Sequence, residues 1–180
     1  MFINPTKRNV LLSIGLCLSF AFTGCKKEGG NEGPGIGKAS IQFSTNKSFG
    51  GKNEFKSNTA AGAMAVKVNT GSRMQITITA IQTNGTQIGT AQLSIHLPQN
   101  QSGPISAKFE NNSQAGTGAV LQIGVGNLGS GQEAYASSTG NFNITKLTDT
   151  EVEGTFDAYC VNQSTNTNIN LSNGKFSGKF

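Results

Sequence analysis

The segment Arg73–Leu97 reads RMQITITAIQTNGTQIGTAQLSIHL and alternates apolar with polar residues on both sides of an Asn-Gly pair. The apolar positions of its two halves are Met74, Ile76, Ile78 and Ala80, and then Ala91, Leu93, Ile95 and Leu97. Successive side chains of an extended chain point to opposite faces, so each half has one apolar and one polar face. The pair Asn84–Gly85 tolerates positive φ and closes two-residue turns. The segment therefore predicts an antiparallel hairpin with one buried face.

The same period of two recurs over most of the chain after residue 38. It predicts further strands at 40–43, 63–68, 105–110, 119–125, 133–137, 141–146, 151–161, 168–171 and 174–180. Ser137–Asn141 and Asn173–Gly174 are predicted to be turns between such strands. No stretch keeps a period of 3.6 over three turns, so no helix is expected. We predict an all-β fold, an antiparallel meander of about ten strands that forms a β-sandwich or a lipocalin-like barrel.

The composition agrees with many short strands joined by tight turns. Charged residues are only 13% of the 180 residues, and there are 24 glycines. The formal net charge is +5, of which Lys7 and Arg8 contribute two in a segment that we expect to be removed. The remaining basic residues are scattered and form no basic stripe, so nucleic acid is not an expected partner.

The start of the chain has the pattern of a leader peptide. Lys7 and Arg8 precede an apolar run at 10–22, which is shorter than the roughly 20 residues of a permanent membrane span. The run ends in FTGC at 22–25, which resembles a lipobox, with Phe where that motif usually has Leu. The resemblance implies cleavage after residue 24 and attachment of a diacylglycerol to Cys25.

This leader divides the chain into three parts. We expect a signal peptide at 1–24, a flexible glycine-rich tether at 25–37 and a single all-β domain at 38–180. Two or three acyl chains hold a protein firmly at a membrane, since each buried CH₂ contributes about 0.8 kcal/mol. The expected location is the outer membrane, on either its periplasmic or its cell-surface face.

The C-terminal strands carry a recurring pattern of glycine and phenylalanine. Its residues are Gly140, Phe142, Ile144 and Thr145, then Gly154, Thr155 and Phe156, then Gly174 and Phe176, preceded by Ala134 and Tyr135. The pattern resembles the closing strands of a family of Bacteroidota lipoproteins of unknown function. The resemblance implies a β architecture and an envelope location, and it supplies no catalytic residue.

One motif and one cysteine have to be considered as a cofactor site and as a nucleophile. GVGNLG at 124–129 matches the dinucleotide fingerprint G-x-G-x-x-G, but the sequence after it leaves no room for the helix that binds the pyrophosphate. We interpret it as a glycine-rich loop between strands, and no cofactor is expected.

Cys160 is the one thiol expected in the mature domain, because Cys17 leaves with the leader and Cys25 carries lipid. It alternates with apolar residues, so we interpret it as a small buried residue.

The remaining candidates for chemistry are carboxylates and one histidine. Glu151, Glu153 and Asp157 share one face of a predicted strand. Glycosidases use carboxylate pairs about 5–9.5 Å apart, but neighbouring positions on any strand face meet that distance, so a solvated outer face is favoured. His96 is the single histidine and is interpreted as a polar residue on an exposed or edge face. Neither a metal site nor a Ser-His-Asp triad is expected.

We predict a lipid-anchored envelope protein whose all-β domain binds a ligand or a partner protein and is not an enzyme. Its outward faces, rich in Thr, Asn, Gln and Ser, suit a glycan or an envelope protein as the partner. One alternative is a lipocalin-like carrier of an apolar ligand, with a cavity lined by Met74, Ile76, Phe142 and Phe156. Another is an envelope glycan hydrolase that uses Glu151, Glu153 or Asp157.

Overall fold

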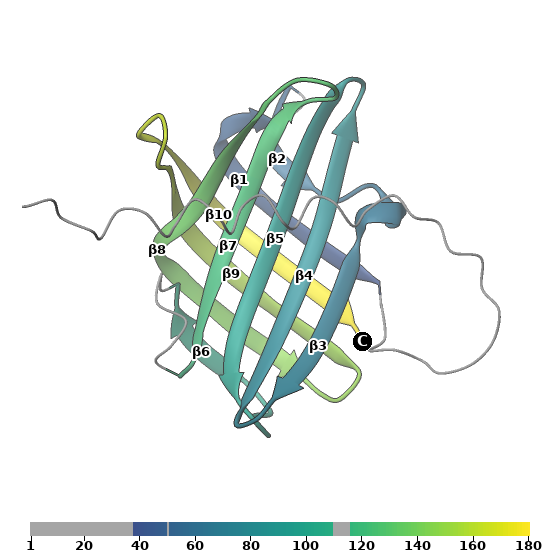
Figure 1. Cartoon of the computed structure of the whole chain (residues 1–180), viewed down its shortest axis with the longest axis vertical. Coiled ribbons are helices and arrows are strands. Elements are labelled where there is room, and N and C mark those ends of the chain that lie inside the picture. The colour runs from purple at the N-terminus through teal and green to yellow at the C-terminus, as the bar shows by residue number, and fades with distance from the viewer. Residues whose placement is uncertain (1–37, 50, 110–115) are drawn as a thin grey trace, which may run out of the picture. The chain divides into compact units, whose positions relative to one another are not determined.

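The structure is a computed structural model that describes residues 38–49, 51–109 and 116–180 (Figure 1). Its strands are β1 (Ala39–Phe49), β2 (Lys52–Lys56), β3 (Met64–Thr70), β4 (Arg73–Asn84), β5 (Gln87–Pro98), β6 (Ile105–Lys108), β7 (Gly118–Asn127), β8 (Gln132–Leu147), β9 (Glu151–Asn162) and β10 (Thr167–Lys179). One turn of 3-10 helix, η2 (Ala60–Gly62), follows β2. No helix among these residues is long and apolar enough to cross a membrane. The predicted all-β fold is confirmed.

The strands form one antiparallel sheet in the order β2-β1-β10-β9-β8-β7-β5-β4-β3, with β6 paired to β8 outside this order. From β3 to β10 the chain follows the predicted meander. The N-terminal β1 lies beside the C-terminal β10, with Ile41 opposite Phe176. In Figure 1 the strands β3, β4, β5 and β7 form a front layer, and β10 and β9 cross behind them.

The short link between β2 and β3 requires the sheet to curl. These strands are consecutive in the chain but lie at opposite ends of the nine-strand order. A flat sheet of that order is about 38 Å wide at the usual strand spacing. The chain from Lys56 to Met64 spans at most about 28 Å when fully extended. The sheet therefore curls into a half-barrel with its core inside.

The link itself joins the two ends of the sheet. Ser57 N–H donates to the Ile41 carbonyl of β1 at 3.1 Å, and Asn58 N–H donates to the Ile81 carbonyl of β4 at 3.1 Å. The Asn58 side chain continues this ladder, since its Nδ2 donates to Thr83 O at 2.8 Å and its Oδ1 accepts from Thr83 N–H at 2.9 Å. Asn58 therefore pairs with β4 as a neighbouring strand does.

Two predicted turns are wrong: the structure has bulges there. Ser137–Asn141 lies inside the continuous β8, and Asn173–Gly174 lies inside the continuous β10. Asn173 has a φ of 53° in a stretch where the register between β10 and β9 shifts. Both segments contain Asn and Gly, which tolerate positive φ, and a bulge can require positive φ just as a turn does. A bulge bends its strand and increases the local twist, and these two bulges lie in β8 and β10, on either side of β9.

The predicted hairpin between β4 and β5 is confirmed, but its turn lies one residue later than predicted. Asn84 pairs with Gln87, so the two turn residues are Gly85 and Thr86. Gly85 has a φ of 59°. Glycine at the first turn position with positive φ is the type II′ requirement, and that turn matches the twist of the flanking strands.

The glycine and phenylalanine pattern of the last strands has a packing cause. Gly154 of β9 lies opposite Phe176 of β10, and Gly174 of β10 lies opposite Phe156 of β9. A methyl group at Gly154 would overlap the Phe176 ring, and one at Gly174 would overlap Phe156. Each ring therefore lies over the backbone of the glycine on the neighbouring strand.

The concave face of the half-barrel encloses one hydrophobic core. Phe43 stacks on Phe55 with ring centroids 5.0 Å apart. The Phe156 ring makes edge-to-face contacts with Phe43 and Phe109, with centroid distances of 6.1 and 6.2 Å. The four side chains that the carrier alternative assigns to a cavity are at most 3% exposed and belong to this core.

Candidate functional site

One end of the half-barrel, which we call the mouth, is lined by polar side chains that continue the buried face of the strands. It is the end where β1 meets β2, β4 meets β5, β7 meets β8 and β9 meets β10. On β5 the buried positions run from Leu97 to Gly89, and the next residue on that face is the exposed Gln87. Other strands change in the same way, at Lys47, Gln82, Asn84, Asn127, Glu133 and Thr167.

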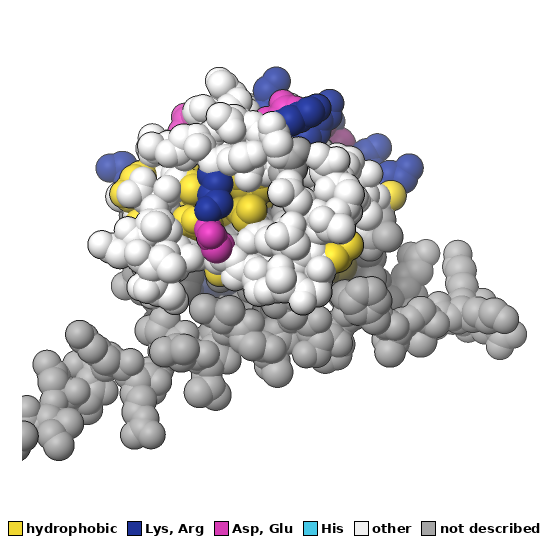
Figure 2. All heavy atoms as spheres, turned by 90° about the horizontal axis from the view of Figure 1, so that it is seen from above, with side chains coloured by type: hydrophobic (Ala, Val, Ile, Leu, Met, Phe, Trp, Pro, Cys, Tyr) yellow, Lys and Arg dark blue, Asp and Glu magenta, His cyan; other side chains and the backbone are white. Residues whose placement is uncertain are grey.

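The surface is hollowed at this end of the molecule. Figure 2 shows hydrophobic side chains at the floor of a hollow, with one basic and one acidic side chain directly beside them. Most of the surface around the hollow is uncharged. The mouth therefore combines an apolar floor with polar walls.

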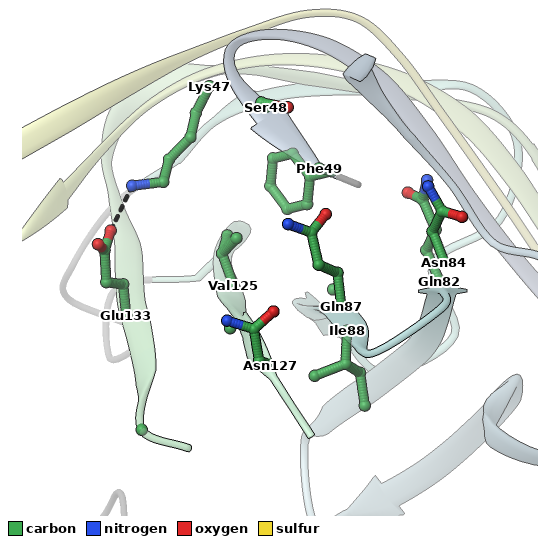
Figure 3. Close-up of a pocket in the computed structure, with 13 residues that line it drawn as sticks. Lys47, Ser48, Phe49, Gln82, Asn84, Gln87, Ile88, Val125, Asn127 and Glu133 are labelled. Atoms are coloured by element: carbon green, nitrogen blue, oxygen red, sulfur yellow. Dashed lines mark hydrogen bonds and ion pairs between the residues drawn. The ribbon is translucent and has the colours of Figure 1, made fainter. Parts of the chain in front are cut away.

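The first hollow of the mouth is lined by amide side chains, and we call it the amide hollow (Figure 3). Its volume is about 220 Å³. The amides belong to Gln82, Asn84, Gln87 and Asn127, and the apolar lining to Phe49, Ile88 and Val125. Gln82 Oε1 accepts a hydrogen bond from the Lys56 N–H at 2.9 Å, which holds that amide in place.

Lys47, Glu133 and Tyr135 form a connected group at one side of this hollow. The Lys47 ammonium donates to Glu133 Oε2, an ion pair drawn in Figure 3, and to Tyr135 Oη at 2.9 Å. Tyr135 O–H donates to the same Glu133 oxygen at 2.5 Å. The group joins β1 to β8, which are separated in the sheet by β10 and β9. It therefore bridges the mouth from one strand to another that is not its neighbour.

The contacts within this group stabilise both charges. Hydrogen bonds with Glu133 and then Tyr135 raise the pKa of Lys47 above its ordinary 10.5. Hydrogen bonds from Lys47 and then Tyr135 lower the pKa of Glu133 below 4.5. Both side chains are therefore charged at neutral pH, and their charges cancel within the mouth.

A second hollow adjoins the first across Lys47 and Glu133, which border both. Its volume is about 440 Å³, and we call it the hydroxyl hollow. The hydroxyls come from Ser48, Tyr135, Thr165 and Thr167. The Asn162 side chain holds the β9–β10 turn in place, because its Oδ1 accepts from the N–H groups of Ser164 and Thr165 at 2.9 and 3.2 Å.

A third hollow, which we call the opposite hollow, lies at the other end of the strands. Its volume is about 310 Å³, and its polar lining includes Asn69, Asn100, Gln101 and Ser102. Lys67 borders it and donates to Thr148 O at 3.3 Å, to Asp149 O at 3.4 Å and to Asp149 Oδ1 at 3.2 Å. The Lys67 ammonium also lies 5.5 Å from the centre of the Phe180 ring. Lys67 thus fastens the β8–β9 turn to the C-terminus.

The three carboxylates of the hydrolase alternative lie on the outer face of β9, where they alternate with buried residues. Glu151 pairs with Lys146 at 2.6 Å, and this hydrogen bond lowers the pKa of Glu151 below 4.5. Glu153 and Asp157 are exposed. The structure brings none of the three to a hollow described above.

His96 is half-buried on the outer face of β5. The expectation of an exposed or edge position is wrong in part, because β5 pairs with β4 on one side and β7 on the other. Partial burial, and then the charge of Arg73, lower the pKa of His96 below 6.5. His96 is therefore predominantly neutral at pH 7.

Cys160 is fully buried among the core residues, as predicted. Burial raises the pKa of its thiol to about 12. A thiol needs its thiolate form to act as a nucleophile, so this cysteine is unreactive in the folded protein.

The prediction of a glycine-rich loop at GVGNLG is confirmed only in part, because its first four residues belong to β7 and only Leu128 and Gly129 lie in the turn after it. Within the described residues, no three His, Cys, Asp or Glu side chains gather into a cation site. The lipobox and Cys25 lie outside the described residues.

No protein family model matches the chain, and no curated protein or solved structure is similar enough to count as a match. The site therefore has to be interpreted from its own geometry. Sequence analysis missed Lys47 and Glu133, which lie 86 residues apart. In the sequence, each appears only as a polar residue at the end of the buried face of a strand. Because polar residues are common at strand ends, this pattern does not single out a site.

Proposed function

We propose that this chain is a lipid-anchored protein of the outer membrane that binds a small polar ligand at the mouth of its half-barrel. The observation that carries the proposal is the pair of adjoining polar hollows above an apolar floor. Small-molecule sites combine apolar walls with a few polar groups, and typically measure about 300–1,000 Å³. The hydroxyl hollow alone, at about 440 Å³, falls within that range.

The direction of the chain supports this proposal. The described domain begins at Lys38, next to the first residue of β1, and Phe49 at the other end of β1 borders the amide hollow. A strand of that length separates the two points by about 33 Å. The described domain therefore begins at the end away from the mouth, and a tether from Cys25 would join it there.

The mouth is favoured over the interior as the binding site. A lipocalin-like carrier needs space around Met74, Ile76, Phe142 and Phe156, and all four are packed in the core. Met74 borders the opposite hollow, and the other three border none of the three hollows. The polar lining of the mouth suits a polar ligand instead.

The binding proposal is tested by screening small polar compounds against the full chain in mild detergent with backbone amide NMR. We expect the resonances of Gln87, Asn127 and Thr167 to shift on binding. Shifts centred on Phe142 and Phe156 would favour the interior carrier. Shifts confined to Asn100 and Gln101 would place the site in the opposite hollow and contradict the proposal.

The anchoring proposal is tested separately with Cys25→Ser. Without the thiol no diacylglycerol is attached, so the protein should move from the membrane fraction to the soluble fraction on cell fractionation, with Cys160→Ser as the matched control. Retention of Cys25→Ser in the membrane pellet would contradict the lipid anchor.

A further inference from the structure

We propose that the ligand of the mouth is a neutral saccharide that spans the amide and hydroxyl hollows and contacts the ion pair of Lys47 and Glu133 between them. This inference rests on the proposed function, because it names the ligand class of the same site.

The ion pair keeps hydrogen-bonding capacity toward both hollows. An ammonium has three N–H donors, and among the described residues Lys47 donates to two acceptors, Glu133 and Tyr135. Both hydrogen bonds to Glu133 reach its Oε2 atom, which leaves Oε1 with no partner in the described part of the chain. A charged donor and a charged acceptor therefore remain at the boundary between the hollows. Hydrogen bonds from ionised groups are roughly twice as strong as neutral ones.

The mouth is electrostatically balanced, which favours a neutral ligand. Lys47 and Glu133 are the charged side chains that line either hollow, and each cancels the other. An anion at Lys47 would meet the Glu133 carboxylate, and a cation at Glu133 would meet the Lys47 ammonium. A sugar hydroxyl both donates and accepts, so it can bond Lys47 and Glu133 without disturbing the pair.

The rest of the lining matches the two kinds of surface that a sugar ring offers. The amides of Gln87 and Asn127 each supply donors and an acceptor for ring hydroxyls, and neither side chain makes a hydrogen bond within the described residues. Phe49 and Val125 give apolar surface for the C–H face of the ring. Thr165 and Thr167 supply hydroxyls on the other side of the ion pair.

The test uses the full chain in mild detergent and three sets of probes. These are short neutral oligosaccharides of glucose, mannose, galactose or xylose, the corresponding uronic-acid oligosaccharides, and short uncharged peptides. We expect a neutral oligosaccharide to shift the amide resonances of both hollows. Its affinity should change less than about twofold between about 0.05 and 0.5 M salt, since no net charge is exchanged.

Variants locate the contacts. Gln87→Ala and Asn127→Ala should each weaken saccharide binding about tenfold, the effect of losing about one hydrogen bond. Gln101→Ala in the opposite hollow is the matched control and should change the affinity less than about twofold. Equal losses in Gln87→Ala and Gln101→Ala would overturn the assignment to the mouth.

The probe sets separate the two proposals. Binding of the uronic acids or the peptides at the mouth, with no neutral saccharide bound, would overturn the ligand class and leave the binding function intact. Saccharide shifts confined to the opposite hollow would overturn both. The absence of shifts with every neutral oligosaccharide would overturn the saccharide proposal.

Discussion

At the end of the half-barrel that holds the opposite hollow, Lys67 donates to three acceptors of the β8–β9 turn, whereas at the mouth Lys47 donates to two side chains, Glu133 and Tyr135. Both lysines pair with a carboxylate and both border a hollow that contains amides. The hydrogen bonds of Lys67 hold a turn in place, whereas Lys47 retains an N–H donor. The same pair of residue types is therefore structural at one end and available for binding at the other.

The two ends also differ in how the core is closed. At the end with Lys67 the last interior residues of three strands are Leu97, Leu147 and Val152, all at most 6% exposed. At the mouth the corresponding residues of β5 and β8 are Gln87 and Glu133, which are polar and exposed, and that of β9 is the buried but polar Asn162. Apolar closure seals a core because it removes hydrocarbon from water, and polar closure leaves a hollow into which a ligand can hydrogen-bond.

The largest expected effect concerns how deep the mouth extends. Cys160 lies below Asn162 on the buried face of β9, so a hollow that reached into the core would expose it. In a full chain with Cys17→Ser and Cys25→Ser, we expect a thiol reagent to label Cys160 at least about 1,000-fold more slowly than in the unfolded protein. The measurement is the labelling rate with and without denaturant. Fast labelling of the folded protein would show that the mouth opens to Cys160.

The next effect compares two ends of one strand, β5. Leu97→Ala at the closed end should lower the free energy of unfolding by about 2–5 kcal/mol, because it removes a fully buried side chain and leaves a cavity. Gln87→Ala at the mouth should change it by less than about 0.5 kcal/mol. Urea unfolding monitored by circular dichroism measures both. Equal losses would mean that Gln87 is part of the packed structure rather than a free lining residue.

A smaller effect separates the two lysines. Lys67→Met should cost about 1–2 kcal/mol of stability, because two backbone carbonyls of the β8–β9 turn lose a charged donor. Lys47→Met should cost less than about 1 kcal/mol, since its partner Glu133 is half-exposed to solvent. Urea midpoints of the two variants give the comparison. The reverse order would contradict the assignment of the structural role to Lys67.

The smallest effect is the pH dependence of the ion pair at the mouth. The pKa of Glu133 is lowered in the folded protein, so the pair stabilises the fold fully above pH 4.5 and loses this contribution as the pH falls through the lowered value. The loss should stay below about 1 kcal/mol, because the pair is partly solvated. NMR titration of the Glu133 carboxyl should show its pKa rising toward 4.5 in Lys47→Met. An unchanged titration would mean that the pair does not form in solution.

Much of the fold was predictable because its causes are local. Alternation along Arg73–Leu97 depends only on which residues neighbour one another, and it predicts the hairpin and its buried face correctly. The bulges at Ser137–Asn141 and Asn173–Gly174 were not predictable, because the same residues suit a turn. Only the partner strand β9, which continues past both places, decides that each is a bulge.

The amino-acid sequence alone determined the all-β class, the faces of most strands and the burial of Cys160, since a two-residue period and the transfer of apolar side chains from water act within a few residues. The tertiary structure decided where the candidate site lies. Polar residues at the ends of separate strands gain a common role only when the sheet curls and brings β1 opposite β8. That curl depends on the short link from β2 to β3 and on the order of the strands, neither of which is visible in any single segment.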